Sequence, residues 1–415
     1  MTDKLPSEWS WRPLNEVVGP PQYGLSNSVD PNGNMPIIGM KDIADGRVSK
    51  NDWSRVSIDE NEKEKYRLNE GDLILNRTNS PALVGKLAIW DHADAAVFAS
   101  YLVRYPAIPS MALPRFTVAA LSTSRSLQQI ERLITRAISQ ANINPTAFYN
   151  DVEIAVPPIR EQARIVFVLE TINRLVEQVD SLIAAKRRRF DAVRINLIET
   201  FQSSSKVGNT WISTEFREIA EELKQRNAAG HGADRVMGVI KGEGLVPMRE
   251  HVMAADLRRY LVVPPQAIAY NPMRLNIGSI AASRYDEDVL VSPDYIVFRA
   301  REGRADANFL RFLIGTKRWR DHLITVGSGS VRTRIYFDGL AEMVLRVPDV
   351  REQKRIGQIL TAMEEDLKTT IEAASALRTQ KRGLMQKLLT GEWRLDERFD
   401  AEAVSPPVLK VGGRS

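Results

Sequence analysis

Two groups of polar and basic residues in this 415-residue chain carry side chains of the kinds that recognise nucleic acids. Each group follows a short apolar run that ends in asparagine, ILN at 74–76 and IAYN at 268–271. Arginine can donate two parallel hydrogen bonds to guanine, asparagine can pair with adenine in the same bidentate way, and lysine can neutralise phosphate. The candidate contacts in the two groups are Arg77, Thr78, Asn79, Lys86, Arg274 and Asn276. The alternative is that both groups are turns whose polar side chains are solvated.

A glycine–serine run, GSGSVRTR at 327–334, supplies a third group. Its glycines would let backbone N–H groups approach a phosphate, and its two arginines would add positive charge. The candidate contacts in this run are Ser328, Ser330, Arg332 and Arg334. The set of residues that we expect to touch a nucleic acid is completed by Tyr23, Lys41 and Lys241.

Several segments resemble fragments of catalytic motifs but lack the parts that carry out the chemistry. NPMR at 271–274 begins like the Asn-Pro-Pro-aromatic motif of adenine methyltransferases, yet it has no aromatic residue to stack on a flipped base. Pro348 and Asp349 are followed too closely by the EQK of 352–354 to form a metal nuclease site. The sequence has no cysteine, no histidine pair at helical spacing and no glycine-rich phosphate loop. We therefore expect no catalytic, metal or cofactor site in this chain.

Length and composition point to a soluble protein of two or three domains. Apolar residues make up 43% of the chain and charged residues 26%, which is typical of globular proteins. No apolar run reaches the roughly 18 residues of a membrane helix, and MTDKLPSEWSW at the start has no signal-peptide core. These features and the lack of cysteine predict a cytoplasmic location. The net charge of +5 is compatible with a polyanionic partner.

The elements that would position the candidate residues occur twice. PPIREQARI at 157–165 recurs as PDVREQKRI at 348–356, with six identical residues at an offset of 191. At an offset of 202, Trp9, Leu14, Glu16 and Val17 match Trp211, Phe216, Glu218 and Ile219. Between these anchors lie short β-branched and aromatic runs broken by Gly, Asn and Pro, which are typical of strands. The repeat predicts two similar units acting on different targets, or else a diverged duplication with one inert half.

A long helix is predicted at the end of each repeat. Residues 159–207 contain neither glycine nor proline, and their apolar residues recur at spacings of three and four, which predicts a helix from about 160 to 202. A second such pattern runs from Ile356 to about Leu389. Burying the two apolar stripes against each other would give an antiparallel coiled coil, because a repeated unit that packs on its own copy creates a pseudo-twofold axis. The alternative is that each helix is buried in its own domain.

A Trp-led strand-rich domain, the motif P-x-x-R-E-Q-x-R-I and a long helix, all repeated once, resemble the specificity subunits of type I restriction–modification enzymes. The resemblance covers about residues 7–395. It implies an α+β fold in which two strand-rich target recognition domains are separated by two long antiparallel coiled-coil helices in a pseudo-twofold repeat. The expected segments are target recognition domains at 1–156 and 208–347, spacer helices at 157–207 and 348–392, and a flexible tail at 393–415. In this family a polar turn and a strand precede the proline of the motif. Residues 139–158 fit this pattern in the first half, and residues 327–349 fit it in the second half.

The family also implies a function. Each domain would read one half of a split site in double-stranded DNA, and the two halves would differ because the two domains differ. The helices would set the gap and dock two methyltransferase subunits, through which restriction–translocase subunits would join. S-adenosylmethionine, ATP and Mg would belong to those partners, and this chain would be non-catalytic and independent of membranes. Two other classes stay open on the residues alone: a self-contained restriction or methylation enzyme, and a coiled-coil adaptor without a DNA function.

Overall fold

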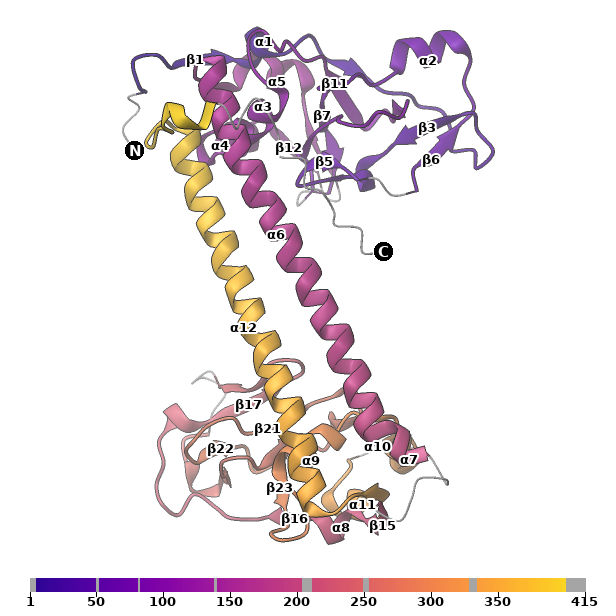
Figure 1. Cartoon of the computed structure of the whole chain (residues 1–415), viewed down its shortest axis with the longest axis vertical. Helices are drawn as coiled ribbons and strands as arrows, with labels where there is room; N and C mark the ends of the chain where they lie inside the picture. Colours follow the sequence, from indigo (N-terminus) through magenta and orange to yellow (C-terminus); the bar gives the residue numbers. More distant parts are fainter. Residues whose placement is uncertain are drawn as a thin grey trace. The chain divides into compact units, whose positions relative to one another are not determined.

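The computed structural model describes residues 5–49, 52–80, 83–137, 140–203, 211–248, 254–327 and 334–400. The chain forms two compact units: unit 1 comprises residues 1–178 and 374–415, and unit 2 comprises residues 179–373. Each unit holds a strand-rich domain and one segment from each of two long helices, α6 (Ile159–Arg194) and α12 (Val350–Leu389) (Figure 1). The predicted α+β class with two strand-rich domains is therefore confirmed.

The strand-rich domain of unit 1 is built around a six-stranded sheet whose central strands are almost completely buried. In spatial order its strands are β2 (Gln22–Tyr23), β11 (Leu102–Tyr105), β7 (Leu73–Asn76), β9 (Leu87–Ile89), β5 (Gly46–Val48) and β4 (Ile43–Ala44). The smaller sheets are β10 (Val97–Phe98), β3 (Met35–Ile38) and β6 (Ser54–Val56); β12 (Ile134–Arg136), β13 (Ala141–Ile143) and β8 (Thr78–Asn79); and β1 (Ser10–Pro13) with β14 (Glu153–Val156). The short helices are α1 (Leu14–Val17), α2 (Glu60–Tyr66), α3 (Pro114–Leu121), α4 (Ser124–Arg132) and α5 (Pro145–Asp151).

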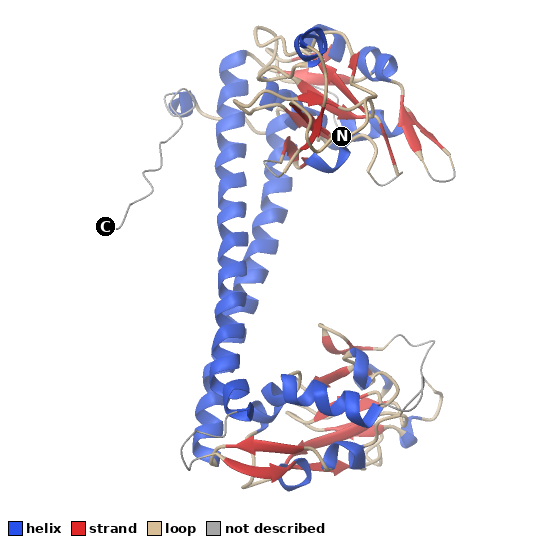
Figure 2. Cartoon of the chain, turned by 90° about the vertical axis from the view of Figure 1, so that its right-hand side faces the viewer, coloured by secondary structure: helices blue, strands red, loops and turns tan. Residues whose placement is uncertain are grey.

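The domain of unit 2 follows the same plan with a four-stranded central sheet (Figure 2). In spatial order its strands are β16 (Ala220–Leu223), β23 (Ile296–Ala300), β20 (Ile268–Tyr270) and β21 (Ile280–Ala282). The strand pairs are β15 (Ile212–Glu215) with β24 (Val344–Val347), β17 (Met237–Ile240) with β18 (Gly244–Pro247), and β19 (Leu261–Val263) with β22 (Val289–Val291). The short helices are α7 (Thr200–Ser203), α8 (Phe216–Ile219), α9 (Ala307–Leu313), α10 (Lys317–Gly327) and α11 (Phe337–Ala341).

The internal repeat extends to the register of the strands. In the antiparallel pair β1–β14 Ser10 faces Val156, and in β15–β24 Ile212 faces Val347, which are 202 and 191 residues further on. In the central sheets, Leu75 pairs with Val103 and Leu87, whereas Ala269 pairs with Val297 and Ala281, each 194 residues further on. The order β2-β11-β7-β9 thus recurs as β16-β23-β20-β21, although little sequence identity marks these strands.

The two long helices run antiparallel within each unit. In unit 1 the lining of one cavity includes Leu169 and Asn173 of α6 together with Met385 and Lys381 of α12, and Leu169 and Met385 belong to one apolar cluster. In unit 2 Lys186 Nζ of α6 donates to Asp366 Oδ1 (2.7 Å) and to Thr370 Oγ1 (2.8 Å) of α12. Later residues of α6 thus lie beside earlier residues of α12. This confirms the predicted antiparallel pair.

The predicted apolar seam is only partly buried. Leu175 of α6 is 45% exposed, Leu182 of α6 is 47% exposed and Ile371 of α12 is 37% exposed. The expectation that the stripes bury each other was therefore wrong for these residues, because a two-helix pair covers only one face of each helix. The helix predicted from about 160 to 202 is confirmed: α6 passes at Arg194 into a short π-helical segment, Ile195–Glu199, which leads directly into α7.

A buried glutamine attaches each strand-rich domain to the first turns of its long helix. Gln162 is completely buried; its Oε1 accepts from Leu113 N (2.8 Å) at the start of α3, and its Nε2 donates to Pro157 O (2.9 Å). Gln353 repeats this in unit 2, where its Oε1 accepts from Asp306 N (3.0 Å) at the start of α9. Its Nε2 donates to the carbonyl of the proline before α12 (2.9 Å). The glutamine of the recurring R-E-Q motif thus anchors the strand-rich domain in both units.

The segment after α12 folds back onto the start of α6 in unit 1. Arg394 donates to both carboxylate oxygens of the buried Glu161 (3.0 and 2.8 Å), and Arg164 pairs with Asp400. Hydrogen bonds to these carboxylates, together with the attraction between opposite charges, raise the pKa of both arginines. The start of the tail that was expected to be flexible from 393 onward is therefore held by ion pairs, and the rest of that tail lies outside the described residues. Among the helices of the described chain, none is long and apolar enough to cross a membrane.

Candidate nucleic-acid interface

In unit 1 the candidate surface is centred on Arg77, which lies between β7 and β8. Its backbone N–H donates to Tyr101 O (3.1 Å), and its carbonyl accepts from Ile143 N (2.9 Å). Its guanidinium carbon lies 5.0 Å from the ring centroid of Tyr23, a cation–π distance. Tyr23 and Tyr101 are each about half exposed, at 50% and 48%. The backbone of Arg77 is therefore fixed on both sides, and an aromatic ring limits where its side chain can point.

Arg77 has no negatively charged partner among the residues that the structure describes, and its Nε is buried without a hydrogen bond. The neighbouring Arg104 differs, because it lies 3.5 Å from the carboxylate of the buried Asp72. Burial raises the pKa of Asp72, and Arg104 acts against that rise. A partly buried cation without a counter-ion is costly unless a ligand supplies the negative charge or the acceptors. The guanidinium of Arg77 thus has hydrogen-bonding capacity that no carboxylate of the described residues uses.

The residues predicted beside Arg77 divide into structural and exposed ones. Thr78 is 7% exposed, and its hydroxyl donates to Asn142 Oδ1 (2.5 Å), so its side chain joins β8 to β13. Asn79 Oδ1 accepts from the N–H of the next residue (2.8 Å), which shapes the following turn. Lys86 is exposed, and its carbonyl accepts from Asn76 N (2.8 Å), so its backbone lies directly beside the end of β7.

Tyr23 and Lys41 are not brought together. Tyr23 lies in β2, at one edge of the six-stranded sheet, whereas Lys41 is exposed in the 3₁₀ turn Met40–Asp42 that precedes β4 at the opposite edge. Tyr23 joins the Arg77 surface through its ring, but Lys41 lies apart from it.

In unit 2 the equivalent surface is a turn that follows β20. Met273 N donates to Asn271 Oδ1 (2.9 Å), and Ser279 N donates to Arg274 O (3.0 Å), so the turn is closed by its own hydrogen bonds. Arg274 and Asn276 are exposed on it. The side-chain oxygen of Asn271 already accepts one hydrogen bond within the turn.

Two further basic residues converge on this turn. The side chain of Lys241 packs over Gly278, whose φ of +94° favours glycine, and a Cβ added there would lie 3.4 Å from Lys241 Cδ. Ile335 N donates to Pro272 O (3.1 Å), which brings the neighbouring Arg334 to the turn. Lys241 and Arg334 are both exposed. The structure therefore gathers three predicted residues, Lys241, Arg274 and Arg334, around one turn.

Of the glycine–serine run at 327–334, the structure describes only the two end residues, Gly327 and Arg334. Ser328, Ser330 and Arg332 lie outside the described residues, so nothing is added to their prediction. Arg334 Nη1 lies 3.5 Å from Tyr336 Oη, and this hydrogen bond raises the pKa of Arg334, which keeps the side chain charged.

The two surfaces occupy equivalent places in the repeat. Ile143 N donates to Arg77 O in unit 1, and Ile335 N donates to Pro272 O in unit 2. Ile335 lies 192 residues after Ile143, which agrees with the predicted correspondence of 139–158 with 327–349. The scaffold is the same, whereas the exposed side chains on it differ.

Sequence reasoning missed several exposed residues on these surfaces. Tyr101 lies beside Arg77, Tyr336 beside Arg334, and Met273 (57% exposed) and Ile277 (59%) lie on the turn of unit 2. Tyr101 precedes an apolar strand, and its aromatic type was the only available signal. Met273 and Ile277 resemble core residues in sequence, so no local pattern distinguishes them.

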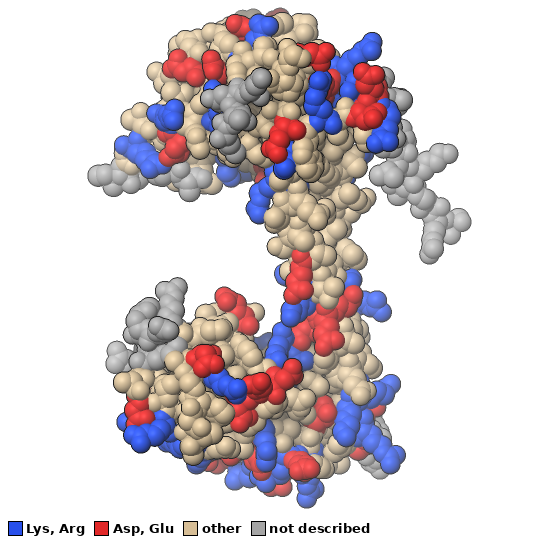
Figure 3. Space-filling model, turned by 90° about the vertical axis from the view of Figure 1, so that its left-hand side faces the viewer, with Lys and Arg blue, Asp and Glu red and all other residues tan. Residues whose placement is uncertain are grey.

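Basic and acidic side chains are mixed on one face of the molecule. On the face drawn in Figure 3, Lys and Arg side chains are interspersed with Asp and Glu in both units. Groups of three or more His, Asp or Glu that could bind a metal ion do not occur in the part of the chain that the structure describes.

Comparison with known proteins gives a consistent result. Residues 6–184 match the family model described as type I restriction modification DNA specificity domain. The chain is 22% identical over 423 residues to the putative type I restriction enzyme MjaX specificity subunit of Methanocaldococcus jannaschii, covering 94% of this chain and 95% of that protein. It is also 22% identical over 175 residues to the type I restriction enzyme StySPI specificity subunit of Salmonella potsdam, covering 41% and 38% of the two chains.

Solved structures share the fold. The S subunit of a type I restriction–modification system from M. genitalium superposes with a TM-score of 0.55 at 14% identity, covering 93% of this chain and 98% of that one. A chain from a study of assembly and conformational transition of the type I R-M system gives a TM-score of 0.52 at 15% identity, covering 94% and 100%. Residues 6–184 thus match a type I restriction modification DNA specificity domain, and over most of its length the chain is similar in sequence and in fold to type I restriction–modification specificity subunits.

Proposed function

We propose that this chain reads a two-part, asymmetric site in double-stranded DNA and that each strand-rich domain contacts one half of the site. The observation that carries the proposal is the pair of equivalent surfaces with unlike side chains. In unit 1 the surface presents Arg77 against Tyr23, and in unit 2 it presents Lys241, Arg274 and Arg334 around a turn. The same scaffold with different hydrogen-bonding groups is suited to two different base sequences.

We further propose that methyltransferase subunits dock on the helix pair. Leu175, Leu182 and Ile371 leave apolar surface exposed on α6 and α12, which a protein partner would cover. Two such subunits would carry S-adenosylmethionine, and restriction–translocase subunits that join through them would use ATP and Mg. The specificity subunit would act in the cytoplasm and would be non-catalytic alone, and its helix pair would set the gap between the half-sites.

The proposal is tested by expressing the chain with its modification subunits in a host that lacks DNA methylation and mapping methylated adenines by long-read sequencing. We expect one split motif with unlike halves. Methylation or cleavage by the purified chain alone would instead indicate a self-contained enzyme. A complex that is stable but enriches no motif from random duplexes would indicate an adaptor without a DNA function.

A further inference from the structure

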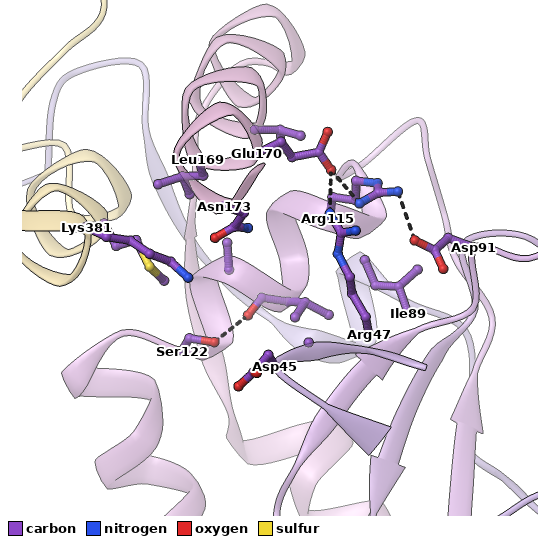
Figure 4. Close-up of a pocket in the computed structure, with 15 residues that line it drawn as sticks. Asp45, Arg47, Ile89, Asp91, Arg115, Ser122, Leu169, Glu170, Asn173 and Lys381 are labelled. Carbon is purple, nitrogen blue, oxygen red and sulfur yellow. Dashed lines mark hydrogen bonds and ion pairs between the residues drawn. The ribbon is translucent and has the colours of Figure 1, made fainter. Parts of the chain in front are cut away.

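A glutamate on α6 joins three elements in unit 1. Glu170 Oε1 forms ion pairs with Arg115 of α3 and, at 3.9 Å, with Arg47 Nη2 of β5 (Figure 4). Arg115 Nη2 also donates to Asp91 Oδ2 (2.9 Å), just after β9. The contacts of Glu170 are ion pairs without regular hydrogen-bond geometry, and its side chain is 33% exposed. The long helix is thus tied by charge to two separate parts of the strand-rich domain.

A glutamate on α12 does the same in unit 2. Arg284, which follows β21, donates to Glu364 Oε1 (2.8 Å), and Arg311 of α9 donates to Glu364 Oε2 (2.5 Å). Arg311 also donates to Thr361 Oγ1 (3.2 Å), one turn earlier on α12. The Glu364 side chain is 32% exposed, close to the value for Glu170. Each carboxylate therefore binds two arginines from two elements of its own domain.

The two glutamates do not occupy matching positions in the repeat. At the offset of 191 Glu170 corresponds to Thr361, and Glu364 corresponds to Asn173. The carboxylate in unit 2 is displaced by three residues, which is about 4.5 Å along a helix. A similar contact, one carboxylate between two arginines, is therefore made by different residues in the two halves. Simple inheritance from the duplication would not produce this arrangement, whereas a shared mechanical requirement would.

We infer that Glu170 and Glu364 are positioning residues, each of which fixes the angle of one recognition domain on the helix pair. Gln162, Ile165 and Leu169 already hold the first turns of α6 in the core of unit 1, and Gln353, Ile356 and Leu360 do the same for α12 in unit 2. Glu170 and Glu364 follow these buried residues, and each adds a charged attachment to two further elements of its domain, which should narrow the range of angles that the domain can adopt. The glutamine contact is uncharged and buried, whereas the glutamate contact is charged and partly solvated, so salt weakens only the second.

The first test measures domain orientation without any partner or DNA. The chain has no cysteine, so Glu64→Cys on α2 and Gln380→Cys on α12, both exposed in unit 1, can be spin-labelled uniquely in the full-length protein. We expect a narrow distance distribution from pulsed electron resonance in the parent protein and a broader one after Glu170→Gln. Raising the salt concentration should broaden the parent distribution towards that of the variant.

The matched control is Glu177→Gln, which removes the same charge from an exposed position of α6 and should leave the distribution narrow. Thermal unfolding of each labelled protein checks that the fold is retained. A distribution in Glu170→Gln as narrow as in the control would overturn the inference. A variant that fails to fold is replaced by Arg47→Gln, which removes one of the two ion pairs and should give an intermediate width.

The second test measures the consequence for recognition, and it rests on the proposed function. The complex with modification subunits is assayed on duplexes in which the gap between the half-sites is changed by one base pair in either direction. We expect Glu170→Gln and Glu364→Gln each to reduce the preference for the native gap by about fivefold in kcat/KM, without changing the bases read in either half. The control for α12 is Glu365→Gln, an exposed neighbour of Glu364.

The two tests fail in different ways. Absence of any methylated motif with the parent complex would contradict the proposed function and would leave the spin-label result intact. A methylated motif whose gap preference is unchanged in both variants would contradict the positioning role.

Discussion

The side chain of Gln162 accepts a hydrogen bond from the backbone N–H of Leu113, 49 residues earlier, at 2.8 Å. This contact joins the first turn of α6 to the start of α3, and Gln353 makes the equivalent contact with Asp306 at 3.0 Å. Because both glutamines are almost completely inaccessible, water cannot replace either contact.

Replacing the anchor by an apolar residue should destabilise the domain that it holds. Gln162→Leu leaves a buried N–H and a buried carbonyl unpaired, which costs about 2 kcal/mol or more of unfolding free energy. Thermal or urea unfolding of the full chain should show a lower midpoint for unit 1. Gln178→Leu, at an exposed position of α6, should leave the midpoint nearly unchanged. A midpoint for Gln162→Leu equal to that of Gln178→Leu would show that the anchor contributes nothing.

Changing Arg77 should relax recognition at one position of one half-site. Arg77→Ala removes a forked donor, and we expect loss of about 1–3 kcal/mol of discrimination for guanine at that position. Arg77→Lys keeps the charge but not the fork, so it should bind DNA better than Arg77→Ala while still discriminating poorly. The discrimination is measured by competition binding of the complex to duplexes in which each base of the half-site is substituted in turn. Arg160→Ala, an exposed arginine in the first turn of α6, is the control. Unchanged base preference in Arg77→Ala would remove Arg77 from the reading surface.

Neutralising the basic residues of unit 2 should reduce the salt dependence of binding. Arg334→Gln, Arg274→Gln and Lys241→Gln should each flatten the slope of log K against log salt by about one unit if the residue contacts a phosphate. Arg332→Gln, in the glycine–serine run, is predicted to do the same. Arg258→Gln is a suitable control, because Arg258 is 83% exposed and pairs with Asp256. If a variant shows the same slope of log K against log salt as Arg258→Gln, the residue that it replaces does not contact a phosphate.

Removing Arg394 should weaken unit 1 through the buried Glu161. The side chain of Glu161 is only 4% exposed, and Arg394→Ala removes its charged partner while the hydrogen bond from Trp9 Nε1 (3.1 Å) is retained. We expect a loss of about 1 kcal/mol or more in unfolding free energy. The double variant Arg394→Ala with Glu161→Gln should recover part of this loss, because the uncompensated charge is gone. Equal stability of the single and double variants would contradict this reading of the ion pair.

Much of the architecture could be predicted from sequence because its causes are local. Apolar residues at spacings of three and four require a helix with one covered face, and Pro157 and Pro348 mark where each helix begins. The repeated P-x-x-R-E-Q motif located both anchors, and alternation of β-branched runs with turn residues located the strands that lead to Arg77 and to Arg274. These signals depend on neighbours within a few residues, so the sequence alone determined the duplicated α+β plan and the helix pair.

The tertiary structure decided which side chains work together. Tyr23 and Arg77 are 54 residues apart and meet only because β2 and β7 both flank β11. Thr78 was expected at the surface, but β13 covers it. Glu170 and Glu364 each pair with two arginines, but the repeat does not align the two glutamates, so no comparison of the two halves could have found them. Such contacts depend on how distant elements pack, and packing is fixed by the whole core, not by any short stretch of residues.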